Sequence, residues 1–140
     1  VVRWLYDALY KKNVECDFVW PESENLSKYK AIFVPALYAV PDETLKRLNR
    51  YAEEGGTLVV TFKSGFANEY VKVHSDVQPH ILREALGVRY DQFTFPKHVG
   101  LKGTFGGGQA RIFMELVQTE GAEVLAAYEH PAWGVKIIEE

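Results

Sequence analysis

Three side chains of metal-binding types lie close together in the sequence: His74, Asp76 and His80. Imidazole and carboxylate groups are common ligands of zinc and related cations. The spacing of the two histidines, however, matches neither the His-x-x-x-His pair of a helix nor any zinc pattern, and no thiol is near them. We therefore expect no metal site and no cofactor.

The candidate nucleophiles are one serine and one cysteine. Ser64 follows an apolar run, where α/β hydrolases place their nucleophile, but Phe62 and Phe66 stand where that sharp turn needs glycine. Cys16 lies inside a short run, residues 15–20, that reads as a strand rather than a strand-to-helix turn. We therefore expect a buried structural thiol and no nucleophilic residue.

Paired acids and a glycine-rich stretch are the remaining candidate motifs. A glycosidase needs two carboxylates facing each other about 5 to 9 Å apart, whereas sequence neighbours such as Glu53 and Glu54, or Glu139 and Glu140, point in different directions. Residues 103–108 are glycine-rich but lack the Gly-Lys-Ser/Thr ending of a phosphate-binding loop. This stretch therefore predicts a hairpin or loop rather than a phosphate site.

The hydrophobic pattern predicts the elements that position these groups. Apolar runs at 30–36 and 57–62 indicate strands buried on both faces, and a helix begins at Pro41 and ends before Gly55. Residues 30–62 therefore form a strand–helix–strand unit. The remaining predicted elements are a helix at 1–12, a short helix at 79–86 capped by Gly87, and strands at 15–20, 88–95, 123–128 and 135–138. The predicted fold class is α/β, with three layers and a mostly parallel sheet flanked by helices.

Length and composition exclude several classes of function. With 140 residues, 47% of them hydrophobic, the chain suits one compact domain over residues 1–140, whereas a complete (β/α)8 barrel needs about 250 residues. The 16 basic and 19 acidic residues give a net charge of −3, which argues against nucleic-acid binding. The sequence contains no membrane-spanning apolar run and only one cysteine. We therefore expect a cytoplasmic protein without membrane partners.

Several fragments, in the same order, resemble the middle, trimerisation domain of glycoside hydrolase family 42 β-galactosidases. The matching fragments are residues 4–10, 14–19, 26–30, 34–38, 51–59, 62–65, 82–88 and 121–126. This resemblance implies a flavodoxin-like fold similar to class I glutamine amidotransferases, without their catalytic apparatus. It also places the catalytic glutamates of a retaining β-galactosidase on a preceding barrel domain, so no residue of this chain inherits a catalytic role.

The resemblance further implies that three subunits assemble through this domain. In that family a loop of one subunit helps to wall the galactose pocket of a neighbour, and residues 63–73 are our candidate for this loop. They follow a predicted strand at the carboxyl edge of the sheet and mix polar with aromatic side chains, as interfaces do. The candidate binding residues are Lys63, Ser64, Phe66, Asn68, Glu69 and Tyr70. An ordinary solvated loop is the alternative.

Five aromatic residues are candidates for stacking on sugar rings or for burial in a subunit interface: Trp4, Trp20, Tyr38, Tyr70 and Trp133. Aromatic side chains are mostly core or partly covered surface, and we expect this of about two in three of them. Tyr38 and Tyr70 lie in loops beyond strands. They are therefore the better interface candidates.

Compared with the family pattern, an opening strand before the first helix and a closing hairpin after Trp133 are missing. The chain is therefore expected to be a fragment of a longer multidomain glycosidase, and a sheet lacking a strand favours pairing with another chain. The predicted function is a non-catalytic trimerisation and pocket-lining domain of an enzyme that hydrolyses terminal β-D-galactosides. The alternatives are a free-standing amidotransferase-like or carbohydrate-active enzyme and a sugar-binding module.

Overall fold

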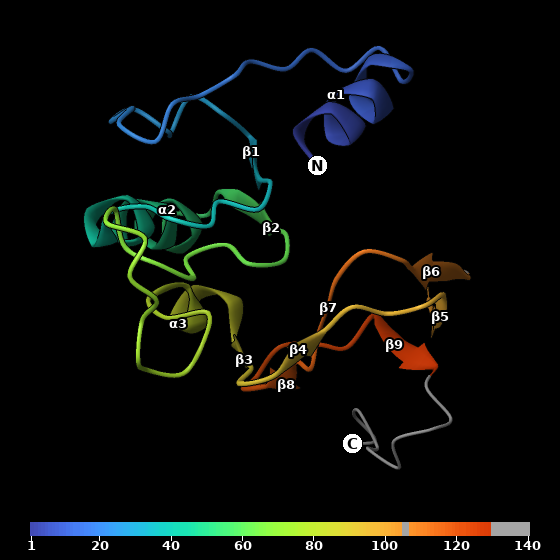
Figure 1. Ribbon diagram of the computed structural model, residues 1–140. Helices are drawn as coiled ribbons and strands as arrows, with labels where there is room; N and C mark the ends of the chain where they lie inside the picture. Colours follow the sequence, from blue (N-terminus) through green and yellow to red (C-terminus); the bar gives the residue numbers. More distant parts are fainter. Residues whose placement is uncertain (105–106, 130–140) are drawn as a thin grey trace. The chain divides into compact units, whose positions relative to one another are not determined.

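A computed structural model describes residues 1–104 and 107–129, and it divides the chain into two compact units (Figure 1). Unit 1 is Val1–Val73 and unit 2 is His74–Glu140. Each unit has its own fully buried leucine, Leu45 in unit 1 and Leu82 in unit 2. No helix of the described residues has the length and hydrophobicity needed to cross a bilayer.

Unit 1 opens with α1 (Val2–Tyr10), which buries none of its residues. The apolar spacing that predicted this helix is confirmed, but its aromatic side chains contact one another rather than a core. Tyr6 stacks on Tyr10, with ring centroids 6.1 Å apart, and on Phe18 at 5.7 Å. The strand predicted at 15–20 is wrong. This segment is extended chain without a pairing partner among the described residues, and Cys16 within it is exposed rather than buried.

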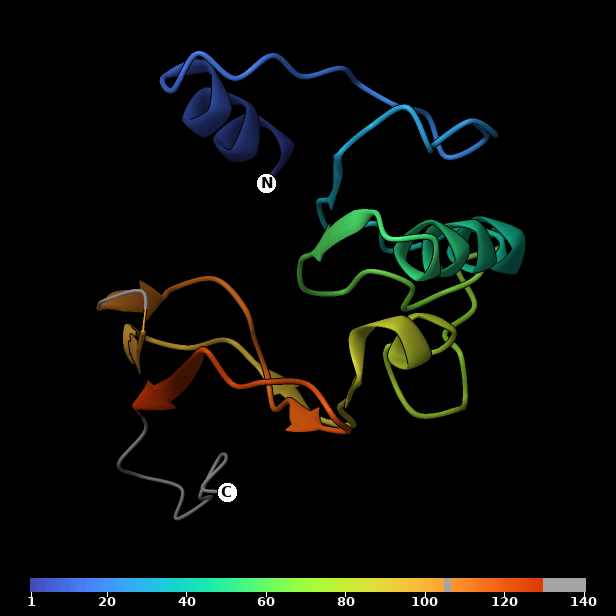
Figure 2. The same cartoon turned by 180° about the vertical axis from the view of Figure 1, so that it is seen from behind.

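The predicted strand–helix–strand unit is confirmed with shorter strands: β1 (Ala31–Val34), α2 (Asp42–Glu53) and β2 (Thr57–Val60). The two strands pair in parallel, from Ala31 opposite Thr57 to Val34 opposite Val60. Figure 2 shows α2 beside β2 from behind. Leu45, Leu48 and Tyr51 repeat at three-residue intervals on α2 and are buried, so this face of the helix supplies much of the unit 1 core.

Two glycines end α2 for different physical reasons. Gly55 has a φ of 92°, a left-handed conformation that favours glycine. Gly56 lies against the Tyr51 ring, where an added Cβ would be 2.2 Å from the ring carbon Cζ. The Tyr51 hydroxyl in turn donates a hydrogen bond to the carbonyl of Tyr29 at 3.0 Å. The glycine pair therefore sets both the chain reversal and the position of a buried tyrosine.

Among the residues that the structure describes, unit 2 opens with a short helix, α3 (Leu82–Leu86), which is followed by paired strands. Gly87 caps α3 with a φ of 61°, as predicted. All the strand pairs of this unit are antiparallel among the described residues. The strands are β3 (Val88–Arg89) with β8 (Gln118–Thr119), β4 (Phe93–Thr94) with β7 (Met114–Glu115), and β5 (Val99–Gly103) between β6 (Gly108–Ala110) and β9 (Ala126–Glu129).

The α/β class is correct, but a three-layer, mostly parallel sheet is not what the described residues form. Their only parallel strand pair is β1–β2, and the other sheets are short and antiparallel. The predicted strand at 88–95 divides into β3 and β4 because Tyr90, between them, exchanges two backbone hydrogen bonds with Gln78. The strand predicted at 123–128 is observed as β9, which begins three residues further along the chain, at Ala126. The strand predicted at 135–138 lies outside the described residues. β5 and β6, which flank the glycine-rich stretch, pair as antiparallel neighbours, and residues 105–106 of that stretch lie outside the described residues.

Candidate functional site

The 63–73 loop lies beside the 35–40 segment, at the edge of the sheet where its sequence position predicted it. Three backbone hydrogen bonds join the two segments: Gly65 N to Leu37 O, Ala67 N to Tyr38 O and Val40 N to Ala67 O. Because β1 and β2 are parallel, both segments leave the sheet at the carboxyl ends of its strands. Ligands of open α/β sheets bind at this edge.

Ser64 supports the loop from inside. Its side chain is buried, and its hydroxyl accepts a hydrogen bond from Leu37 N at 3.2 Å and donates one to Val34 O at 3.3 Å. The Thr61 hydroxyl makes the equivalent pair of bonds, accepting from Ala36 N at 2.8 Å and donating to Val34 O at 3.3 Å. The two hydroxyls therefore satisfy backbone groups just beyond β1. Ser64 is in this respect a structural residue, and it does not reach the surface.

Lys63 and Phe66 form the next layer of the loop. Phe66 is buried and stacks on Tyr38, with ring centroids 5.4 Å apart. The Lys63 ammonium lies 3.4 Å from the centroid of the Phe66 ring, which is a cation–π contact. Lys63 also adopts a positive φ of 59°. The structure thus brings Lys63, Phe66 and Tyr38 together as one cluster. Phe66 is the buried member of this cluster.

Asn68 shapes the exposed tip of the loop. Its side-chain oxygen accepts hydrogen bonds from the backbone amides of Tyr70 and Lys72, each at 3.0 Å. Such local bonds from asparagine favour a turn over a strand. Glu69 and Tyr70 are consequently exposed at the tip, where Tyr70 keeps 82% of its surface accessible. Of the six predicted site residues, Glu69 and Tyr70 are the two that are exposed.

The three residues of metal-binding type at the start of unit 2 are brought into contact. The rings of His74 and His80 stack with their centroids 3.6 Å apart, and Asp76 pairs with His80 at 2.6 Å. The backbone makes this contact possible, because His80 has a φ of 55°, in the left-handed region, and sits in a turn rather than on a helix.

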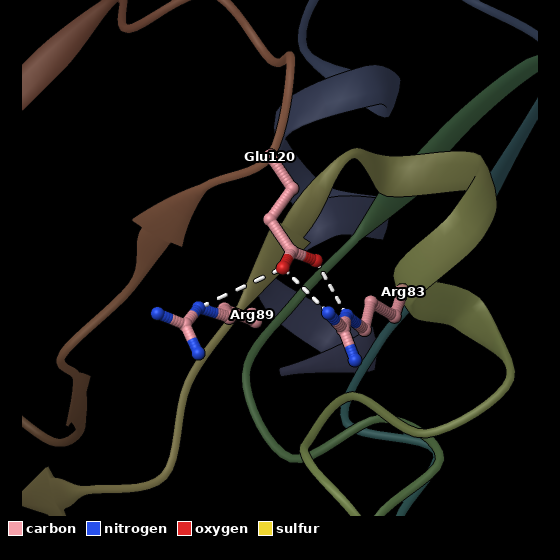
Figure 3. A network of polar contacts seen from close by, with 3 residues as sticks. All are labelled: Arg83, Arg89 and Glu120. Carbon is pink, nitrogen blue, oxygen red and sulfur yellow. Dashed lines mark hydrogen bonds and ion pairs between the residues drawn. The ribbon is translucent and has the colours of Figure 1, made fainter.

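Sequence reasoning missed an ion-pair network in unit 2 (Figure 3). The Glu120 carboxylate accepts two hydrogen bonds from the Arg83 guanidinium and lies 3.6 Å from Arg89. The Arg83 hydrogen bond, with the positive charges of both arginines, holds the pKa of Glu120 below its usual value against a smaller opposing effect of desolvation. The network joins α3, β3 and the turn after β8. No local pattern in the sequence signals it, because Glu120 lies 37 positions from Arg83.

Two tyrosines of unit 2, the buried Tyr90 and the partly covered Tyr128, are not suited to act as catalytic bases. Burial raises the pKa of Tyr90, and the neighbouring Glu115 carboxylate raises it further. The pKa of Tyr128 is raised by the same two causes in the same order. Both hydroxyls therefore stay protonated at neutral pH, whereas a general base must be deprotonated in order to accept a proton.

The four described aromatic candidates lie at the surface and differ in exposure. Tyr38 keeps 39% of its surface accessible and Trp4 59%, so both are partly covered, whereas Trp20 and Tyr70 keep 76% and 82%. Trp133 lies outside the described residues. Aromatic surface of this kind is typical of interfaces.

Comparison with known proteins gives the same family throughout. The family described as "Beta-galactosidase trimerisation domain" matches residues 1–136. The chain is 35% identical over 132 residues to β-galactosidase BgaB of Geobacillus sp. (strain Y412MC61), covering 92% of this chain and 20% of the relative. It is 36% identical over 136 residues to β-galactosidase BgaA of Planococcus sp. (strain 'SOS Orange'), covering 91% and 20%.

A solved relative supports the same assignment. The β-galactosidase of Bacillus circulans sp. alkalophilus is similar in structure with a TM-score of 0.81 and 34% identity, covering 88% of this chain and 19% of that one. The chain thus spans about a fifth of the length of the relatives that it matches. From the family match and these identities together, we conclude that this chain belongs to the β-galactosidase trimerisation domain family.

Proposed function

We propose that this chain is the assembly domain of a β-galactosidase that hydrolyses terminal β-D-galactosides, and that three copies associate through it. The observation that carries the proposal is the family match across residues 1–136, which runs through both compact units. The relatives compared above are named β-galactosidases. Both units would then act as one domain of a homotrimer, within a cytoplasmic enzyme.

The chain's own part in the reaction is indirect. The hydroxyl of Ser64 is engaged with Leu37 and Val34, and Cys16 lies on extended chain rather than at a strand-to-helix turn. Neither arrangement is that of an activated nucleophile beside a base. We therefore assign the bond-breaking carboxylates to a barrel domain of the parent enzyme, and to this chain the placement of neighbouring barrels around a water-poor pocket.

The 63–73 loop is the proposed contact with a neighbouring subunit and its galactose pocket. Asn68 holds the turn, and this leaves Glu69 and Tyr70 exposed beyond a buried base formed by Ser64 and Phe66. An exposed aromatic ring beside a carboxylate suits both burial against another chain and a hydrogen bond to a sugar hydroxyl. Lys63, whose ammonium lies over the Phe66 ring, is the remaining charged residue of the proposed contact.

We also propose that the β1–α2–β2 unit belongs to a three-layer sheet of the flavodoxin-like or class I glutamine amidotransferase-like type. Two observations support it: the parallel pairing of β1 with β2, and the partial exposure of Phe33 and Val59 on those strands. Parallel sheets are normally covered on both faces and extended by further strands. Assembly would supply such cover.

Sedimentation velocity of the full 140-residue chain tests the association. We expect a species of three times the mass of one chain, and we expect Tyr70→Ser to weaken the association at least tenfold, because an aromatic anchor at an interface centre contributes strongly to binding. Phe95→Ser is the matched control, since Phe95 is 72% exposed in unit 2 and should leave the association unchanged.

A chain that remains monomeric at every concentration would contradict the proposed trimer. Equal effects of Tyr70→Ser and Phe95→Ser would remove the loop from the interface. The purified chain should also fail to hydrolyse an aryl β-galactoside. Turnover that disappears on changing one of its own side chains would instead favour a free-standing enzyme.

A further inference from the structure

The 63–73 loop changes abruptly from buried to exposed along the chain. Residues 64–67 are all buried, whereas residues 69–73 are all exposed. Ala67, the last buried residue, is fully covered and forms two bridges, a parallel one with Ala39 and an antiparallel one with Val73. The exposed tip therefore stands on a base that is joined to the rest of unit 1.

The tip closes on itself through hydrogen bonds. Asn68 N donates to Lys72 O at 3.0 Å, and Val71 N donates to Asn68 O at 2.9 Å. The Asn68 side-chain oxygen accepts from Tyr70 N and from Lys72 N. Residues 68–72 thus form a hydrogen-bonded ring, which we call the 68–72 ring, and Asn68 takes part in every one of these bonds.

Val71 adopts an unusual backbone conformation within this ring. Its φ is 62°, in the left-handed region, which a β-branched residue rarely adopts and which costs free energy. Successive side chains of a strand alternate between two faces, and a left-handed residue interrupts that alternation. Tyr70 and Val71 are neighbours in sequence, and yet they keep 82% and 63% of their surfaces accessible. The ring therefore presents two adjacent apolar side chains together.

The chemistry of the 68–72 ring suits burial against protein. Glu69 and Lys72, which flank the apolar pair, are exposed and carry opposite charges. An apolar centre with a charged rim is the usual composition of a small contact surface, and tyrosine is frequent among the residues that contribute most to binding. The partner that fits is an apolar recess with a polar border. A second copy of this chain is the partner favoured by the family's description as a trimerisation domain.

We propose that the 68–72 ring is a preformed contact for a second copy of this chain, and that Asn68 is the positioning residue that holds Tyr70 and Val71 in it. This inference rests on the proposed function. Because the ring is already closed in the single chain, association avoids the entropic cost of ordering a flexible loop. Asn68 therefore acts through the conformation of its neighbours and needs no contact with the partner.

A concentration series in sedimentation velocity tests the role of Asn68. Asn68→Ala removes the acceptor of two amides and should weaken the association about three- to tenfold, with little change in the urea midpoint because the ring is exposed. Asn68→Asp keeps an acceptor oxygen and should stay within about twofold of the wild type. Asn25→Ala is the matched control. Asn25 is also an exposed asparagine of unit 1, its side-chain oxygen accepts a bond from the Ser27 hydroxyl at 3.0 Å, and its loss should leave the association unchanged.

Amide hydrogen exchange separates a preformed ring from one that forms on binding. At a concentration where single chains predominate, we expect the amides of Tyr70 and Lys72 to be protected in the wild type and to exchange at least about tenfold faster in Asn68→Ala. Exchange at the unfolded-chain rate in the wild type would overturn the inference. So would a trimeric wild type whose association is unaffected by Asn68→Ala. A wild type that stays monomeric at every concentration would contradict the proposed function, and this inference with it.

Discussion

At the scale of single residues, the chain carries two kinds of ionic contact with different exposure to water. The pair of Lys46 with Glu43 on α2 is a local surface contact at 2.6 Å, of the kind that contributes little to stability. The contacts of Glu120 instead join segments that are distant in sequence, and both arginine partners converge on one carboxylate (Figure 3). The contacts of Glu120 with the two arginines therefore help to stabilise the tertiary structure.

We expect Glu120→Gln to lower the stability of the chain at pH 7 and to make it less sensitive to acid. The Arg83 hydrogen bond lowers the pKa of Glu120 in the folded state, so its contribution is present above the unfolded pKa and is lost as the pH falls through the folded one. Urea denaturation between pH 7 and pH 3 measures this. The gap between wild type and variant should close toward the acid end. The exposed Glu84 on α3 provides the control, Glu84→Gln, and an equal, pH-independent loss in both variants would contradict the assignment.

At the scale of elements, the connection from α2 to β2 shows how one residue type serves two purposes. Gly55 N and Gly56 N donate to the carbonyls of Ala52 and Tyr51 at 3.0 and 2.9 Å, which closes the end of the helix. The absence of a side chain at Gly56 then leaves space for the Tyr51 ring. The turn and the core of unit 1 are therefore coupled.

We expect Gly56→Ala to destabilise the chain by about 1–3 kcal/mol, the usual cost of forcing extra volume into a packed site. The methyl group would overlap the buried Tyr51 ring, which must then move and lose its hydrogen bond to Tyr29. Gly107→Ala is the matched control, because no atom of the described residues lies within 4 Å of the added Cβ there. Equal midpoints for the two variants in urea denaturation would show that the ring is not constrained as described.

At the scale of the whole molecule, two cores rather than one organise the chain. The core of unit 1 surrounds α2, whereas that of unit 2 includes Leu82, Tyr90 and Met114. Large aromatic residues remain exposed in both units, among them Trp20 and Tyr70 in unit 1 and Phe95 in unit 2.

We expect Leu45→Ala to destabilise the chain by about 2–5 kcal/mol, because a fully buried leucine leaves a cavity when it is truncated. Amide hydrogen exchange should show the largest loss of protection in α2 and in β1 and β2, since local stability follows the contacts that are removed. Leu82→Ala, which truncates the fully buried leucine of unit 2, should shift the loss to α3 and β3. Identical exchange patterns for both variants would mean that the two cores unfold as one.

The sequence alone determined those features whose cause lies within a few neighbouring residues. Periodic leucines and a tyrosine specified α2, the apolar runs specified β1 and β2, and Gly87 marked the end of α3. Ordered fragments along the chain indicated the family, which the comparisons confirm. Local propensity and binary pattern carry this information because helix turns, caps and buried runs are short-range structures.

Only the tertiary structure decided which distant groups meet. The fold pairs β3 with β8 and brings Glu120 to Arg83 and Arg89. It buries Ser64 and Phe66 but exposes Tyr70. It also stacks the ring of His74 on that of His80. It also left residues 15–20 without the predicted strand. A strand or an ion pair depends on a partner that the fold brings near. A residue in the left-handed conformation, such as His80, changes the direction of the chain, and no periodic pattern of apolar residues predicts it.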